Sequence, residues 1–186
     1  MLHILHIDIK SKEEIIETIT IYDNIIKRGN TQNINIALSN LLYCHIKKDD
    51  QEMAIKCLND NEERDITLFT SNFFKQALYI ACHTYDNDLF TSWYEKYRSS
   101  RFYNDGSIDA DVISLFKDFM DEISHNEIAV KAEEILKGLK KNIDNKDDII
   151  CILEILYHLA KDDGDNDKAL SIMNELYDIM KMDFSS

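Results

Sequence analysis

The chain of 186 residues has no proline, only 4 glycines, no C-x-x-C cysteine pair and no long apolar run. Missing proline and scarce glycine argue against many tight turns and against a sandwich of short strands. They favour long helices, which proline would break. No run approaches the roughly 18 apolar residues of a membrane span, and residues 1–8 lack the basic start of a signal peptide. We therefore expect a cytoplasmic protein in which Cys44, Cys57, Cys82 and Cys151 are buried free thiols.

Negative charge is what the chain has in excess. It carries 35 acidic against 21 basic residues, for a formal net charge of −14. Such a surface repels nucleic-acid phosphates and anionic membranes, so we expect neither as a partner. Residues 101–186 hold 20 acidic against 10 basic residues, whereas residues 1–100 hold 15 against 11. A basic protein would be attracted most strongly to the C-terminal half, although the same charge can serve solubility alone.

A turn pattern recurs along the chain. Polar pairs, mostly acidic, separate apolar segments of helical periodicity, and each is followed by a small residue and preceded by a large apolar one. The small residues, spaced by 37, 38 and 40, are Ala54, Thr91, Ala129 and Ala169; the large ones, at the same spacings, are Leu41, Leu78, Phe116 and Leu156. Self-similarity with a period of about 20 to 50 residues is typical of stacked repeats.

Apolar periodicity predicts an all-α protein with one domain over residues 1–186. A leading amphipathic helix is expected over 13–28, with Ser11 as its N-cap and Gly29 after its end. Residues 98–106 read as a longer connection and a hinge, and residues 1–9 as the only candidate strand. Four helical hairpins are expected to follow the leading helix, over residues 33–59, 68–98, 109–141 and 147–181.

Two of these hairpins resemble tetratricopeptide repeats. The similarity is carried by Leu41-Leu42-x-x-His45 before Asp49-Asp50-x-x-x-Ala54, and by Leu156-Tyr157-x-x-Ala160 before Gly164-Asp165-x-x-x-Ala169. The period exceeds the family's usual length, and the family's terminal proline is missing. The resemblance implies a right-handed stack of antiparallel helical hairpins with a concave binding face. A non-repetitive helical bundle is the structural alternative.

The resemblance also assigns partner-binding positions to the first helix of each hairpin. That inner face becomes acidic toward the C-terminus and lacks the lysine and asparagine pattern with which family members hold a terminal carboxylate. Its implied residues are Asn40, Tyr43, Gln76, His83, Asp111, Asp118, Asp121, Glu122, Glu154 and His158.

The aromatic residues offer a second candidate surface. Phe90, Trp93, Tyr94 and Tyr97 follow helical spacing, and we expect that stripe to pack into the core rather than to bind a partner. Two further aromatics on the adjoining connection, Phe102 and Tyr103, are the better candidates for exposure and partner binding.

Known catalytic and metal motifs are missing. An EF-hand counted from Asp163 fails at its sixth position, Lys168, and at its twelfth, Asn174. The recurring Cys44-His45 and Cys82-His83 pairs point about 100° apart on a helix, which does not suit zinc. We predict no metal, no cofactor and no catalytic residue.

The leading functional hypothesis is therefore a protein-binding module that neutralises a basic protein, as a bacterial immunity or inhibitor protein would. The first alternative is a secretion chaperone or adaptor that holds a client segment in a groove. The second alternative is an enzyme with a carboxylate site, which buried carboxyl groups of shifted pKa in one pocket would indicate.

Overall fold

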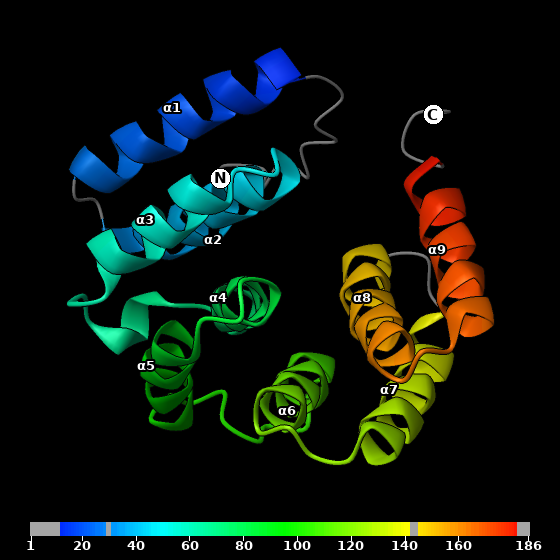
Figure 1. Cartoon of the computed structure of the whole chain (residues 1–186). Helices are drawn as coiled ribbons and strands as arrows, with labels where there is room; N and C mark the ends of the chain where they lie inside the picture. Colours follow the sequence, from blue (N-terminus) through cyan, green and yellow to red (C-terminus); the bar gives the residue numbers. More distant parts are fainter. Residues whose placement is uncertain (1–11, 29–30, 142–144, 182–186) are drawn as a thin grey trace. The chain divides into compact units, whose positions relative to one another are not determined.

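The computed structural model describes residues 12–28, 31–141 and 145–181, and within these ranges the chain is all-helical with no strand (Figure 1). No described helix has the length and apolar character needed to cross a membrane. The candidate strand over residues 1–9, Ser11 and Gly29 lie outside the described residues. The helices are α1 (Lys12–Arg28), α2 (Thr31–Lys47), α3 (Gln51–Asn61), the short 3-10 helix η1 (Ile66–Leu68), α4 (Ser71–His83), α5 (Asn87–Arg98), α6 (Ile108–Met120), α7 (His125–Leu139), α8 (Lys146–Asp162) and α9 (Asn166–Lys181).

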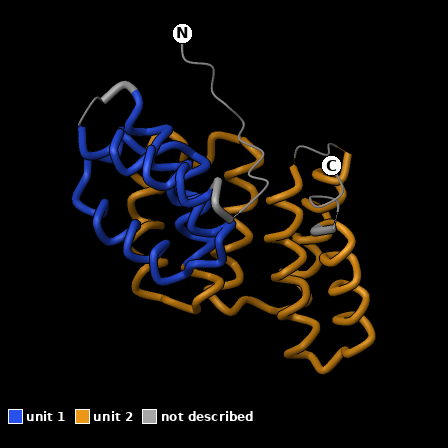
Figure 2. Tube along the Cα trace, turned by 90° about the horizontal axis from the view of Figure 1, so that it is seen from above, with its two compact units in different colours: residues 1–80 blue, residues 81–186 orange. Residues whose placement is uncertain are grey.

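The helix contacts divide the chain into two compact units, residues 1–80 and 81–186 (Figure 2). The division falls inside α4 and not in the connection between α5 and α6, where the sequence suggested a hinge. A single domain over the whole chain, and a continuous right-handed stack of hairpins, both stay predictions.

Helices α3, α5, α6 and α9 each begin at a side-chain cap. The carboxylates of Asp50, Asp86 and Asp165 accept hydrogen bonds from the backbone N–H three residues ahead, at 3.3, 2.9 and 3.0 Å. The hydroxyl of Ser107 does the same for α6 at 3.3 Å. Such caps satisfy N–H groups that have no partner inside the helix. The recurring acidic residues of the sequence are therefore largely helix caps.

Four helix ends share one backbone motif. At the ends of α2, α4, α6 and α8, one residue adopts a left-handed conformation: Asp49 (φ 57°), Tyr85 (φ 52°), Glu122 (φ 51°) and Gly164 (φ 73°). Its N–H donates to the carbonyl three residues back, and the next N–H donates to the carbonyl five residues back, as in Asp165 N to Ala160 O at 2.8 Å. This is the Schellman motif, and only one of the four positions carries the glycine that normally occupies it.

In unit 1, α2 packs against α1, α3 and η1, and apolar side chains between them form the core. The Ser39 and Thr70 hydroxyls share a 2.6 Å hydrogen bond. The Thr70 hydroxyl also accepts a hydrogen bond from Phe73 N at 3.0 Å and so caps the N-terminus of α4. Phe69 stacks on Phe73 with ring centroids 4.7 Å apart. The largest fully buried side chains of this unit are Leu38, Leu42, Leu58, Phe73, Phe74 and Leu78.

In unit 2, α8 is the central helix. It packs against α7, α9 and α6, which explains why its apolar residues cover most of its surface (Figure 1). The thiol of Cys82 donates to the Phe116 carbonyl at 3.8 Å and joins the end of α4 to α6. Trp93 on α5 is fully buried. The buried apolar residues of α8 are Ile149, Ile152, Leu153, Ile155, Leu156, Leu159 and Ala160.

The predicted helix boundaries agree with the structure to within a few residues, but the repeat alignment is wrong in two hairpins. Counted from the N-cap, the fourth residue of α3 and α9 is the buried alanine expected there, Ala54 and Ala169. In α5 and α7 the same position holds Phe90 and Ile128, both buried. Thr91, one residue later, is exposed, and Ala129 is half-buried. A small buried residue at the fourth position is therefore not repeated in these two hairpins.

The cysteines are free thiols, as expected. Cys44, Cys57 and Cys82 are buried, and Cys151 is half-buried. Burial raises the pKa of Cys44 to about 11 and that of Cys57 to about 12, so both thiols are protonated at neutral pH. They serve as small apolar residues of the core.

Candidate functional site

The turn after α4 presents an aromatic side chain to solvent. Tyr85 holds the left-handed position of the Schellman motif, where its N–H donates to Cys82 O at 3.1 Å and the Asp86 N–H donates to Ala81 O at 2.9 Å. A residue other than glycine costs about 1–2 kcal/mol in this conformation. The side chain of Tyr85 is nevertheless 56% exposed. An exposed tyrosine at a strained position is a candidate for function.

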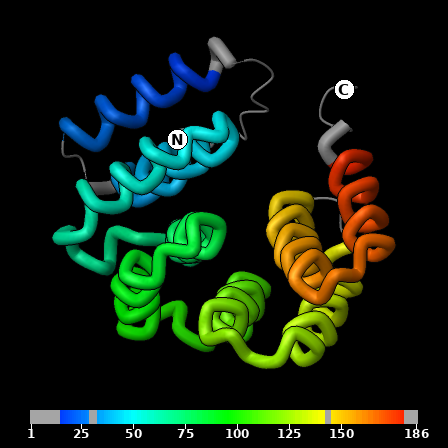
Figure 3. The backbone as a smooth tube through the Cα atoms, viewed as in Figure 1, coloured from blue at the N-terminus to red at the C-terminus, as the bar shows by residue number. Residues whose placement is uncertain are grey.

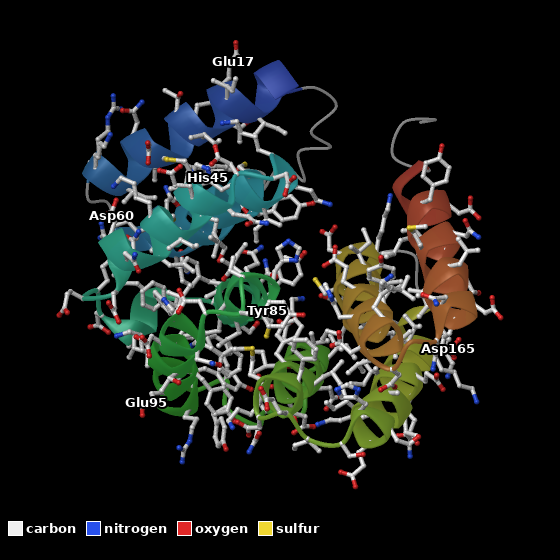
Figure 4. All side chains as sticks on the ribbon, in the orientation of Figure 1. Glu17, His45, Asp60, Tyr85, Glu95 and Asp165 are labelled. Atoms are coloured by element: carbon white, nitrogen blue, oxygen red, sulfur yellow. The ribbon has the colours of Figure 1, made fainter. Side chains whose placement is uncertain are left out.

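Two aromatic rings from different helices hold Tyr85 in place. The ring of Phe119, in the last turn of α6, lies 6.0 Å away at an angle of 48°. The ring of His158, on α8, lies 6.0 Å away at 89° and meets Tyr85 edge to face. Both distances are in the range in which aromatic pairs attract. The side chain of Tyr85, labelled in Figure 4, is therefore positioned by unit 2 although it faces solvent.

A histidine and a carboxylate lie beside these rings. Nδ1 of His83, at the end of α4, is 3.9 Å from Oε2 of Glu154 on α8. Glu154 and His158 are four residues apart and so share one face of α8. We call His83 and Glu154, together with the three rings described above, the Tyr85 cluster. Its members are His83, Tyr85, Phe119, Glu154 and His158.

The surroundings of the Tyr85 cluster are negatively charged. Partial burial, and then the nearby charge of Asp162, raise the pKa of Tyr85, so its hydroxyl stays neutral and can donate a hydrogen bond. Asp162 ends α8 and is exposed. Glu122, three residues after Phe119, is exposed in the turn that follows α6. The cluster thus combines aromatic surface with carboxylates at its edge.

Three of the predicted site residues belong to this cluster, namely His83, Glu154 and His158. Lysines of the chain pair with two members of the predicted acidic face, and the role of that face in binding stays a prediction. Asp118 forms an ion pair with Lys131 of α7, and Asp121 forms one with Lys117. The predicted residues Glu122 and Asp111 are exposed.

The predicted site residues of unit 1 have contacts within that unit. The amide of Asn40 donates to the Tyr22 hydroxyl at 3.0 Å, and the Lys47 ammonium lies 5.2 Å from the centre of the Tyr43 ring. Gln76 is buried, and its Oε1 has no hydrogen-bond partner among the described residues. Little of Gln76 is left to contact a partner, and its role as a binding residue stays a prediction.

The aromatic helix α5 packs inward, as expected. Phe90, Trp93 and Tyr97 are buried. On the connection that follows, Phe102 is half-buried with the Arg101 guanidinium 4.8 Å from its ring centre. Tyr103 is exposed, and its ring lies 5.5 Å from that of Tyr97.

Sequence reasoning missed Tyr85 and Phe119. A signal for Tyr85 was present, because it directly precedes the N-cap Asp86, as Asp49 precedes Asp50 and Gly164 precedes Asp165. The signal is that an aromatic residue stands at a turn position that favours glycine. Phe119 carries no such signal, since its contact with Tyr85 depends on how α4 and α6 pack.

The described residues contain no cluster of metal-ligating side chains. Within the described residues, no three His, Cys, Asp or Glu side chains are placed to hold a metal ion. In the acidic turn between α8 and α9, the carboxylate of Asp165 caps α9, and that of Asp163 lies 2.7 Å from Nδ1 of His125. These contacts give the turn a structural role.

Comparison of the chain with known protein families, with curated proteins and with solved structures found no match. The support for the candidate site comes from the geometry of the described residues and not from a known relative.

Proposed function

We propose that the chain is a protein-binding module whose Tyr85 cluster contacts a basic protein partner and, as an inhibitor or immunity protein would, occupies the partner's basic surface. The observation that carries the proposal is the exposed Tyr85, held by rings from α6 and α8 at a strained backbone position. Tyrosine, tryptophan and arginine dominate the residues on which protein interfaces depend most. A tyrosine fixed before binding also loses little conformational entropy on association.

Charge supports a basic partner. Residues 81–186 carry 23 acidic against 12 basic residues, a net charge of −11, whereas residues 1–80 carry 12 against 9. Asp162, whose charge acts on Tyr85, and Glu122, in the turn after α6, are both exposed. An acidic surface of this kind accelerates association with a basic protein, and salt screens the effect over about 8 Å at physiological ionic strength. The pairing of Asp118 and Asp121 with lysines leaves Glu122 and Asp162 as the carboxylates we expect to contact the partner.

Photo-crosslinking tests this proposal directly. Benzoylphenylalanine replaces Tyr85 in the full chain, and the same group replaces Tyr103 as a matched control on another exposed tyrosine. We expect the variant at position 85, and not the variant at 103, to crosslink one basic protein in cells of the source organism. A crosslinked protein that is acidic, or equal crosslinking from both positions, would contradict the proposal.

The recovered pair then allows a quantitative test. Tyr85→Ala should weaken binding by about tenfold or more, as expected for a central interface tyrosine. Glu122→Gln and Asp162→Asn should slow association and reduce its salt dependence, with little change in the dissociation rate. An affinity that is unchanged by Tyr85→Ala would exclude the cluster as the contact surface.

A further inference from the structure

The last helix of unit 2 exposes an apolar stripe. Leu170, Met173 and Tyr177 on α9 are 53%, 47% and 58% exposed. With 100° of rotation per residue, these side chains fall within about 60° of one another and extend over about 10 Å of helix. The adjoining face of α9, centred about 100° away around the helix, is already used, because Ala169 and Ile172 are buried. We call Leu170, Met173 and Tyr177 the α9 stripe.

The α1 helix shows that exposed apolar residues do not by themselves make a stripe. Ile16 and Ile21 are also more than half exposed. They are five residues apart, so they point about 140° away from each other around the helix. Single exposed apolar residues of this kind are normal on protein surfaces. The three residues of the α9 stripe differ because they lie along one line.

Helix α7 indicates what would cover the α9 stripe. Counted from the N-caps Ser124 and Asp165, the eighth and twelfth positions are Ala132 and Leu136 in α7 and Met173 and Tyr177 in α9. In α7 both residues are buried, and this helix packs against α6 before it and α8 after it (Figure 3). In α9 both residues are exposed; this helix packs closely on α8, and ion pairs of Lys168 with Glu133 and of Glu175 with Lys140 join it to α7. A helix placed against α9, as α8 is placed against α7, would cover the stripe.

Charge at the edge of the stripe defines the chemistry of that helix. Asp167 and Asp178 are exposed on one edge, and no described residue forms an ion pair with them. A helix with basic residues beside its apolar face complements this edge. A second copy of the chain, itself of net charge −14, would be repelled.

We propose that the α9 stripe is a docking site for an amphipathic α-helix of another protein, with an apolar face and basic flanks. The apolar face packs on Leu170, Met173 and Tyr177, and the basic flank lies along Asp167 and Asp178. Such helices present anchor residues at i, i+3, i+4 and i+7. The proposed site is distinct in its residues from the Tyr85 cluster and does not depend on it.

Three stapled helical peptides of about 14 residues, each about 21 Å long, provide the test. The first has a leucine stripe with lysine flanks, the second has the same stripe with glutamate flanks, and the third has the lysines but no stripe. Fluorescence anisotropy measures their binding to the full chain and to its Met173→Ser, Tyr177→Ser and Tyr85→Ala variants. Both serine substitutions are at exposed positions, so folding should be retained, which circular dichroism checks.

We expect the first peptide to bind at least about tenfold more tightly than the other two, since it alone matches both the stripe and its edge. Met173→Ser and Tyr177→Ser should each weaken that binding by about tenfold, the loss expected for a central interface residue. Tyr85→Ala should leave it unchanged, which separates this site from the Tyr85 cluster.

Other results would overturn the proposal. Binding that survives both serine substitutions would place the peptide elsewhere, and failure of all three peptides to bind would exclude the site. Sedimentation of the parent chain as a dimer that Tyr177→Ser dissociates would show that a second copy covers the stripe. Loss of binding only in Tyr85→Ala would assign the peptide to the Tyr85 cluster instead.

Discussion

Replacing Glu122 with glycine should stabilise the protein, although glycine usually destabilises a folded chain. Glu122 holds the left-handed position after α6 with φ 51°. Removing its Cβ relieves about 1–2 kcal/mol of backbone strain. Glycine also makes the unfolded chain more flexible, which costs about 0.4–1 kcal/mol. The net gain is about 0.5–1 kcal/mol, and a gain of 1 kcal/mol would raise Tm by about 2–4 °C in a chain of this size.

The reverse substitution is available in the same unit. Gly164 holds the equivalent position after α8 with φ 73°, and an added Cβ would meet no atom within 4 Å. Gly164→Ala therefore changes only the backbone terms and should destabilise by about 0.5–1 kcal/mol. Both positions lie in residues 81–186, so one unfolding transition reports on both variants.

Urea unfolding followed by far-UV circular dichroism measures these changes. Glu122→Ala is the control, because it removes the carboxylate but keeps a Cβ at the strained position; its stability should stay within about 0.5 kcal/mol of the parent. If Glu122→Gly were no more stable than Glu122→Ala, or if Gly164→Ala were neutral, backbone strain would not be what distinguishes these turns.

Two further predictions concern packing and pH. Ala54→Leu and Ala169→Leu should each lower the free energy of unfolding, measured in thermal melts, by about 1–3 kcal/mol, because both alanines are buried. Thr91 is exposed, so Thr91→Leu should lower it by less than about 0.5 kcal/mol. Equal losses at all three positions would contradict the observed register. Burial lowers the pKa of His45 from its ordinary value of 6.5, so its contribution to stability is complete above pH 6.5 and is lost as the pH falls toward the lowered pKa. His45→Leu should flatten that part of the curve of unfolding free energy against pH, and a curve with unchanged slope would show that another group controls it.

The helices were predictable because each signal was local. Apolar periodicity located the helices, and the acidic residues at positions 50, 86 and 165 marked helix starts, since a capping carboxylate acts within three residues of its own position. The alignment of Thr91 and Ala129 with the two buried alanines was wrong because it ignored this local signal. It matched small residues, although the N-cap sets the register, and the fourth position can hold phenylalanine or isoleucine where the helices pack differently.

The candidate site was only partly predictable, because its contacts are not local. His83 and Glu154 are distant in sequence and meet through the packing of unit 2, and the resemblance to tetratricopeptide repeats had assigned both to one inner face. Of the two lysine pairs that neutralise predicted binding residues, Lys117–Asp121 was visible as an i, i+4 spacing, whereas Lys131–Asp118 joins two helices. The left-handed conformations of Asp49, Tyr85 and Glu122 carried no glycine signal.

The Schellman turns have a consequence for how this surface can evolve. Backbone hydrogen bonds close each turn, so the turn itself does not depend on which side chain stands at its left-handed position. Residues other than proline and the β-branched ones can replace glycine there for about 1–2 kcal/mol of strain, and because all four positions are exposed the core need not repack. Aspartate, tyrosine, glutamate and glycine all occupy this position in the chain, so the side chain displayed at a helix end can change while the backbone of the turn stays constant. At these positions the chemistry of the surface and the closure of the turn are separately adjustable properties of one chain.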